Sequence, residues 1–135
     1  MKKGFTLIEL LAVIIIISIV SLITVPAIMN VIKDSKKGVL RDTAYGLIRI
    51  GQKQYSEGLL DGIYNGEVFE WSNSNLQSTG LEYSGSAPQN GIIKISNKGV
   101  IDIAVHDGTW CAYKKANMVE VELEKINYTA CKSKL

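Results

Sequence analysis

The stretch FTLIELLAVIIIISIVSLITVPAIMNVI, residues 5–32, decides how this chain is organised. It contains no charged residue from Leu10 to Ile32, and as a helix this run would extend roughly 35 Å, enough to cross a lipid bilayer. Glu9 stands at its border, where a carboxylate without a partner would cost about 3 kcal/mol in hydrocarbon. Such a residue is typical of a functional position, so we expect Glu9 to have a partner.

The residues on either side of this run predict its orientation. Lys2 and Lys3 precede it, and no Ala-x-Ala cleavage site follows it, which argues against an ordinary secretory signal peptide. Basic residues at the N-terminus favour a cytoplasmic position for that end. We therefore expect the bulk of the chain to lie outside the cytoplasm.

The composition allows one modest globular domain after the apolar run. The chain has 135 residues, with 15 Lys and Arg against 13 Asp and Glu. A nucleic-acid-binding protein would show a basic face or stripe, and this balance does not indicate one. A small net charge also favours dense packing of copies, because self-repulsion is weak.

The N-terminal residues KKGFTLIELL resemble the leader and first residues of the type IV pilin family. The match covers a short basic leader, Gly4 before the cut, Phe5 as the new first residue, and Glu9 shortly after it. The resemblance implies that a prepilin peptidase removes residues 1–4 and N-methylates Phe5. It also implies a role for Pro26, which stands where such pilins often carry a proline in their first helix.

Cleavage before Phe5 would give Glu9 a partner. The cut frees an α-amino group whose ordinary pKa is about 8, so the group is largely charged. When apolar helices pack side by side, Glu9 of one subunit can pair with the Phe5 amine of its neighbour, and both buried charges are compensated. We therefore interpret Glu9 as an assembly residue that sets register; the alternative is a surface carboxylate that reaches water.

The helix is predicted to extend beyond the apolar run, over residues 5–58. Residues 5–32 form its transmembrane and assembly half, and residues 33–58 form an amphipathic half. Pro26 should kink it. One stripe of the second half is apolar and is expected to cover a sheet: Leu40, Ala44, Leu47, Ile48, Gly51 and Tyr55.

The remaining residues predict an α+β fold. Residues 59–91 are rich in Ser, Asn and Gly and indicate a connecting loop, with room for one short strand or turn. Residues 92–135 contain alternating segments separated by turns, which predict an antiparallel sheet of three to four strands, apolar on one face. One long helix packed on such a sheet matches the type IV pilin fold that the resemblance implies.

The two cysteines, Cys111 and Cys131, belong to no CxxC pair, so a zinc site is not indicated. If the C-terminal part lies outside the cell, a disulfide that bounds the C-terminal loop is the natural interpretation. The alternative is two reduced, buried thiols.

The sequence indicates no active site. His106, the single histidine, is interpreted as a polar turn residue in an HDG turn. Three glutamates at 120, 122 and 124 alternate with apolar residues, which is typical of a solvated strand face. Nucleotide-binding and nucleophile motifs are absent from the sequence. We therefore expect no catalytic, cofactor or metal site.

These features favour a structural pilin. The resemblance implies a filament of identical copies with roles in adhesion, twitching motility or aggregation. It also implies a membrane assembly platform, a separate ATPase, and residence in the cytoplasmic membrane before export into the pilus. A pseudopilin of a competence or type II secretion apparatus is the alternative. A membrane-anchored enzyme or binding domain is less favoured, because it leaves Glu9 unexplained.

Overall fold

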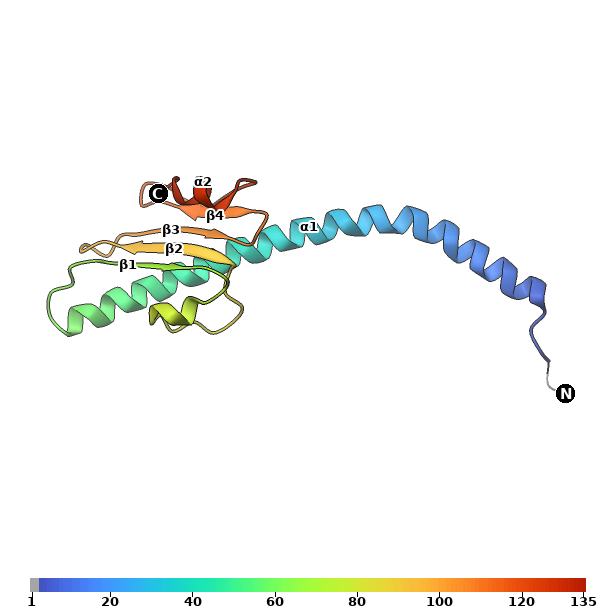
Figure 1. Ribbon diagram of the computed structural model, residues 1–135, viewed down its shortest axis with the longest axis horizontal. Helices are drawn as coiled ribbons and strands as arrows, with labels where there is room; N and C mark the ends of the chain where they lie inside the picture. Colours follow the sequence, from blue (N-terminus) through green and yellow to red (C-terminus); the bar gives the residue numbers. More distant parts are fainter. Residues whose placement is uncertain (1–2) are drawn as a thin grey trace. The chain divides into compact units, whose positions relative to one another are not determined.

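The computed structural model describes residues 3–135, which begin with one long helix. Helix α1 (Leu7–Leu60) has 54 residues and confirms the predicted long helix, with each end displaced by two residues (Figure 1). Pro26 lies inside α1, and the helical assignment continues through it. The expected kink at Pro26 stays a prediction. The chain divides into two compact units, one up to Lys36 and one from Lys37 to Leu135.

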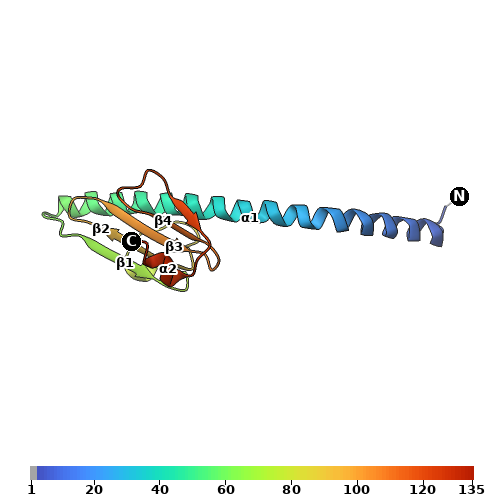
Figure 2. The same cartoon turned by 90° about the horizontal axis from the view of Figure 1, so that it is seen from above.

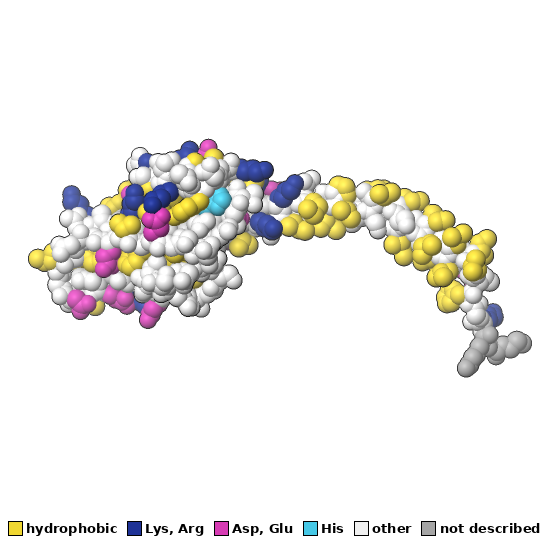
Figure 3. All heavy atoms as spheres, viewed as in Figure 1, with side chains coloured by type: hydrophobic (Ala, Val, Ile, Leu, Met, Phe, Trp, Pro, Cys, Tyr) yellow, Lys and Arg dark blue, Asp and Glu magenta, His cyan; other side chains and the backbone are white. Residues whose placement is uncertain are grey.

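The first unit is a helical segment that buries none of its described side chains. Every residue from Lys3 to Lys36 is exposed. By length and composition, α1 is apolar enough to cross a membrane, and none of its most apolar window is buried within the chain. On the face seen in Figure 3, hydrophobic side chains cover the N-terminal half of α1.

The second unit is built on a five-stranded antiparallel sheet. Its order is β1-β2-β3-β4-β5, so every strand pairs with its neighbour in sequence (Figure 1). In the middle of the sheet, Ile93 of β2 lies opposite Ile103 of β3. The strands are β1 (Glu67–Trp71), β2 (Asn90–Ile95), β3 (Ile101–His106), β4 (Cys111–Lys114) and β5 (Glu122–Glu124).

The C-terminal part of α1 packs on one face of this sheet, as the apolar stripe predicts. Leu40, Ala44, Leu47 and Gly51 are buried, and the first three join one core with the β2 and β3 residues of that face. Gly51 permits close approach, because a Cβ there would lie 3.0 Å from Cδ1 of Ile101. A larger residue at position 51 would therefore require the Ile101 side chain to move.

The expected strand count was too low. Strand β1 lies within residues 59–91, which were predicted to be mainly a connection. Its apolar signal is weak because it is an edge strand: Val68 is 63% exposed, and only Trp71 is buried. The indole N–H of Trp71 donates to the carbonyl of Pro88 at 3.0 Å, which fastens the rest of this segment to the core. A short 3-10 helix, η1 (Leu76–Thr79), contributes the buried Leu76.

The other face of the sheet is also covered, although only one apolar face was expected. Helix α2 (Tyr128–Lys132) packs against β2, β3 and β4 on the face away from α1 (Figures 1 and 2). Beneath it lies a second small core of four buried residues: Ile92, Ala104, Cys111 and Cys131. The sheet is therefore the middle layer of three.

Candidate functional site

The residues that the leader motif singles out lie at the start of α1. Gly4 and Phe5 precede the helix in a stretch without regular structure, and the Phe5 side chain is 92% exposed. Glu9 lies in the first helical turn and is exposed as well. The peptide bond between Gly4 and Phe5 is therefore in an accessible, non-helical segment.

Thr6 and Glu9 form a capping box at this helix start. The main-chain N–H of Thr6 donates to Oε2 of Glu9 at 2.8 Å, and the Thr6 hydroxyl donates to the same oxygen at 2.9 Å. In return, the Glu9 N–H lies 3.4 Å from the Thr6 hydroxyl oxygen. This reciprocal pattern satisfies N–H groups that have no partner inside the helix. Sequence reasoning missed it, although Thr-x-x-Glu is its recognised signature.

Glu9 therefore has hydrogen-bond donors in Thr6, and within the described residues it has no partner of opposite charge. Among residues 3–135, no lysine or arginine forms an ion pair with it. Both donors of Thr6 reach Oε2, so Oε1 can accept a further donor from outside the chain. The capping box holds the carboxylate beside the backbone N–H of Thr6, the residue after Phe5.

The helix that follows carries hydroxyl groups in a form that hydrocarbon tolerates. Ser18, Ser21 and Thr24 each donate to the carbonyl oxygen four residues earlier, at 2.7 to 2.8 Å. Because each of these hydroxyl groups already donates to a carbonyl of its own helix, none of the three leaves an unsatisfied donor on the helix surface. Surrounding lipid or apolar helices would meet a surface without unpaired hydroxyl protons.

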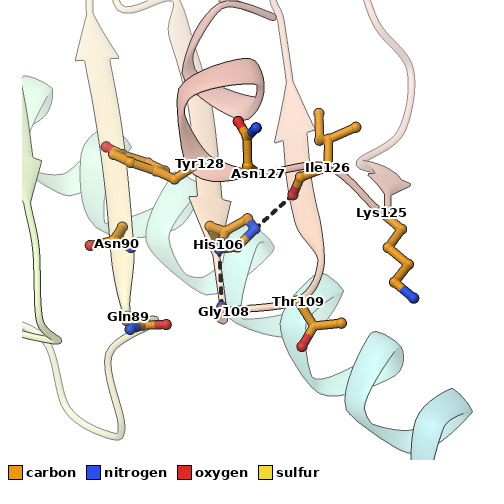
Figure 4. A pocket seen from close by; sticks show the side chains of 9 residues that line it. All are labelled: Gln89, Asn90, His106, Gly108, Thr109, Lys125, Ile126, Asn127 and Tyr128. Atoms are coloured by element: carbon orange, nitrogen blue, oxygen red, sulfur yellow. Dashed lines mark hydrogen bonds between the residues drawn. The ribbon is translucent and has the colours of Figure 1, made fainter.

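His106 lies in the second unit, and its environment differs from the predicted polar turn. It is the last residue of β3, is only 6% exposed, and borders a hollow of about 490 Å³ (Figure 4). Its Nε2 lies 2.7 Å from the carbonyl oxygen of Ile126, and its Nδ1 accepts from the N–H of Gly108 at 3.0 Å. Both ring nitrogens are therefore engaged with backbone, which is a structural arrangement.

The C-terminal segment, residues 125–135, is tied to both edges of the sheet. Cys131 forms a disulfide with Cys111 of β4. Lys132 contacts both carboxylate oxygens of Glu70 on β1 at 2.7 Å, and Lys134 contacts Glu124 on β5 at 2.7 Å. Burial, followed by the charge and hydrogen bond of Glu70, raises the pKa of Tyr128. We call this segment the strap.

The acidic residues of the last strand serve structural contacts. Glu122 accepts from the Tyr113 hydroxyl at 2.8 Å, and this bond raises the pKa of Tyr113. Across residues 3–135, no three His, Cys, Asp or Glu side chains are placed to hold a metal ion.

Comparison with known families identifies the N-terminal segment. Residues 1–25 match the family model described as the prokaryotic N-terminal methylation motif. This range contains Gly4, Phe5 and Glu9, the three residues that sequence reasoning had assigned to cleavage, methylation and assembly. Comparisons with curated proteins and with solved structures gave no match.

The motif and the fold agree with one another. The long apolar helix fits the matched leader, and the helix packed on an antiparallel sheet is α+β. The chain thus carries the leader of type IV pilins and pseudopilins on a type IV pilin-like α+β fold.

Proposed function

We propose that this chain is a pilin, which polymerises into a type IV pilus filament after residues 1–4 are removed. One observation carries the proposal: the matched methylation motif, residues 1–25, contains the start of a long apolar helix, and none of the most apolar window of that helix is buried among the described residues. In water that segment would expose a large apolar surface. Lipid before assembly, and copies of the same helix afterwards, would bury it.

Glu9 and Phe5 supply the specific contact in this proposal. Cleavage would leave a charged amine on Phe5, close to the capping box. In a bundle of apolar helices, that amine could donate to Oε1 of Glu9 on the neighbouring copy. An ion pair in such a low-dielectric core is strongly preferred to two separated buried charges. The pair therefore favours one stagger between adjacent helices, with Phe5 methylation following cleavage.

The second unit would lie outside the cytoplasm. Its disulfide between Cys111 and Cys131 fits an oxidising compartment. The proposed partners are the prepilin peptidase, a membrane assembly platform and a separate ATPase, because the sequence contains no nucleotide-binding motif. Adhesion, twitching motility and aggregation are the proposed roles of the fibre.

A pseudopilin of a competence or type II secretion apparatus is the second candidate, since the matched motif serves both groups equally. Mechanical shearing of cells distinguishes a pilin from a pseudopilin. A pilin is released from cells in long fibres that contain this chain, whereas a pseudopilin stays with the cell envelope.

The decisive experiment compares two matched variants at the helix start. Glu9→Gln keeps the capping box, because Gln also accepts from the N-cap residue, but removes the charge. Thr6→Ala removes the capping hydroxyl and keeps the charge. We expect Glu9→Gln to reduce sheared fibres by at least about tenfold, since each factor of ten corresponds to only about 1.4 kcal/mol. Thr6→Ala should still form fibres.

Intact mass and membrane fractionation complete this experiment. Both variants should insert in the membrane and lose residues 1–4, and the wild type should also gain one methyl group. Normal fibres from Glu9→Gln would exclude the charge pairing. A mature wild-type chain that retains its first four residues would exclude the filament proposal and favour a tethered domain.

A further inference from the structure

Two Asn-Gly dipeptides occur in this chain, at residues 65–66 and 90–91. Asparagine followed by glycine readily loses its side-chain amide, because glycine has no Cβ to hinder attack of its main-chain nitrogen on the preceding side chain. The reaction needs an accessible amide carbon and a glycine nitrogen that can move toward it. The two dipeptides therefore place the same chemistry in two structural settings.

The dipeptide at 90–91 lies inside the sheet. Asn90 and Gly91 are the first two residues of β2, and Gly91 lies opposite Trp71 of β1 and Val105 of β3. Pairing on both sides fixes the main chain of Gly91. Gly91 is buried, and the Trp71 ring lies so close to it that a Cβ there would overlap the ring. The Gly91 nitrogen can therefore approach the Asn90 side chain only if this part of the sheet opens.

The dipeptide at 65–66 lies outside regular structure, in the connection between α1 and β1 (Figure 1). Asn65 is exposed, and Gly66 is half-buried. Within residues 3–135, the Gly66 N–H has no hydrogen-bond acceptor, and no hydrogen bond restrains the side-chain amide of Asn65. Water reaches this amide, and no hydrogen bond has to break before the Gly66 nitrogen can attack it.

Two Asp-Gly dipeptides complete the set of such steps in the sequence, and both have an engaged glycine nitrogen. Gly62 donates to the carbonyl oxygen of Leu59 at 3.3 Å, and Gly108 donates to Nδ1 of His106 at 3.0 Å. In the part of the chain that the structure describes, only the step at 65–66 combines an exposed side chain with a glycine N–H that has no partner.

We propose that the Asn65–Gly66 step is a site of spontaneous modification, at which the Asn65 amide becomes a carboxylate. The Gly66 nitrogen forms a bond to Cγ of Asn65, and the bond from Cγ to the side-chain nitrogen breaks. Ammonia leaves and takes the proton of the Gly66 N–H with it. Water then opens the cyclic imide at either of its two carbonyl carbons, which gives aspartate or isoaspartate. The step consumes only water.

Either product changes the start of β1. A negative charge appears two residues before Glu67, and isoaspartate also lengthens the main chain by one methylene group. Gly66 has little room for such a change, because a Cβ there would lie 2.9 Å from the carbonyl oxygen of Ile95. We therefore expect conversion to disturb the first pair of this edge strand, Glu67 with Ile95. The proposal does not depend on the assembly function, and it holds for a pilin and a pseudopilin alike.

Peptide mapping of the full chain, aged in detergent micelles at mildly alkaline pH, tests the site. Digestion with pepsin in acid suppresses further reaction, and a fresh sample gives the background. Mass spectrometry should show that Asn65 is converted at least about tenfold faster than Asn90, since each factor of ten needs only about 1.4 kcal/mol of protection. Conversion of native Asn65 no faster than that of native Asn90 would overturn the proposal.

The same measurement in guanidinium chloride separates the fold from the local sequence. With the sheet unfolded, Asn65 and Asn90 should react at similar rates, because both are followed by glycine. A difference that persists in the unfolded chain would show that the structure does not protect Asn90, and it would overturn the argument from the sheet.

Two variants confirm the position. Gly66 has a φ of +89°, where a larger residue is strained, so the substitutions are made at Asn65. Asn65→Gln keeps an amide but places its carbon too far away for the same cyclic imide, so the acidic form seen by isoelectric focusing should not appear on ageing. Asn65→Asp should migrate with the aged wild type from the start. An acidic form that still accumulates in Asn65→Gln would place the modification elsewhere.

Discussion

The two compact units of this chain share helix α1, whose apolar side chains are exposed in the first unit and buried along one stripe in the second. From Leu10 to Ile32, α1 carries no charged residue, and every residue there is exposed in the part of the chain that the structure describes. From Lys37 onward, only one stripe of α1 is apolar, and the sheet buries that stripe completely at Ala44 and Leu47. The comparison teaches that the width of the apolar surface indicates whether a helix will be covered by its own chain or by something outside it.

The largest expected contrast comes from removing a leucine side chain in each unit. Leu47→Ala should lower the free energy of unfolding of the second unit by about 3 kcal/mol, because it leaves a cavity in the main core. Leu22→Ala, at a position 77% exposed, should change it by less than about 0.5 kcal/mol. Urea unfolding in micelles, followed by tryptophan fluorescence, measures both, since Trp71 and Trp110 lie in the second unit. Equal losses of unfolding free energy in Leu47→Ala and Leu22→Ala would contradict this difference between the two units.

The disulfide should contribute nearly as much as a core leucine. Cys131→Ser opens a loop with a sequence separation of 20 between the bonded cysteines, and we expect a loss of about 3 kcal/mol in the same assay. A reducing agent should weaken the wild type to the same degree and leave the variant unchanged. Equal stability of variant and wild type without reductant would show that the bridge does not form in the protein.

Alkaline pH should act on the second unit, because residues 3–36 contain no tyrosine. Burial, followed by the hydrogen bond to Glu67, raises the pKa of Tyr64 to about 12 from its ordinary value of 10. The folded state therefore holds this proton more tightly than the unfolded state. The contribution of Tyr64 to the free energy of unfolding is fully present below pH 10 and is lost as the pH rises toward 12.

We expect Tyr64 to account for about 1 to 2 kcal/mol of that alkaline loss. Tyr64→Phe should remove its share of the decline between pH 10 and pH 12. A smaller decline should remain, since the pKa values of Tyr113 and Tyr128 are raised as well. An unchanged pH profile in the variant would contradict the assignment to Tyr64.

The smallest contrast concerns the two helix caps. Asn127 caps α2 by accepting from the Ala130 N–H at 2.8 Å, and Asn127→Ala should cost about 1 kcal/mol. Thr6→Ala removes the cap of α1 and should leave the unfolding of the second unit unchanged, because its contacts stay within the first turn. Circular dichroism and the fluorescence assay together would detect a departure from this pattern.

The long helix and its buried stripe could be predicted because their signals are local. Burial of Leu40, Ala44 and Leu47 follows the 3.6-residue period of the helix, which the sequence displays directly. The leader residues Gly4, Phe5 and Glu9 could also be found, since the motif around them is contiguous.

The edge strand and the strap could not be predicted in the same way. Strand β1 has two glutamates and the exposed Val68 among five residues, so its pairing with β2 decides its structure. The disulfide between Cys111 and Cys131 that bounds the strap was predicted, but the strap also depends on the ion pair between Lys132 and Glu70, which are 62 residues apart in sequence. Such contacts leave no periodic pattern. His106 was misplaced for the same reason, because Ile126 lies 20 residues away.

The capping box changes what Glu9 would contribute to the free energy of the proposed assembly. Before any neighbour arrives, Oε2 of Glu9 already accepts two hydrogen bonds from Thr6, so a solitary subunit does not hold a stranded carboxylate. A neighbouring amine would add one more bond and would not rescue an unsatisfied group. In the proposed filament, the free energy gained at this contact would then come from pairing the two charges and not from satisfying an unmade hydrogen bond. The Thr6 hydrogen bonds would thus make a single copy easier to hold in the membrane, and the charge of Glu9 would remain available to select the neighbouring amine.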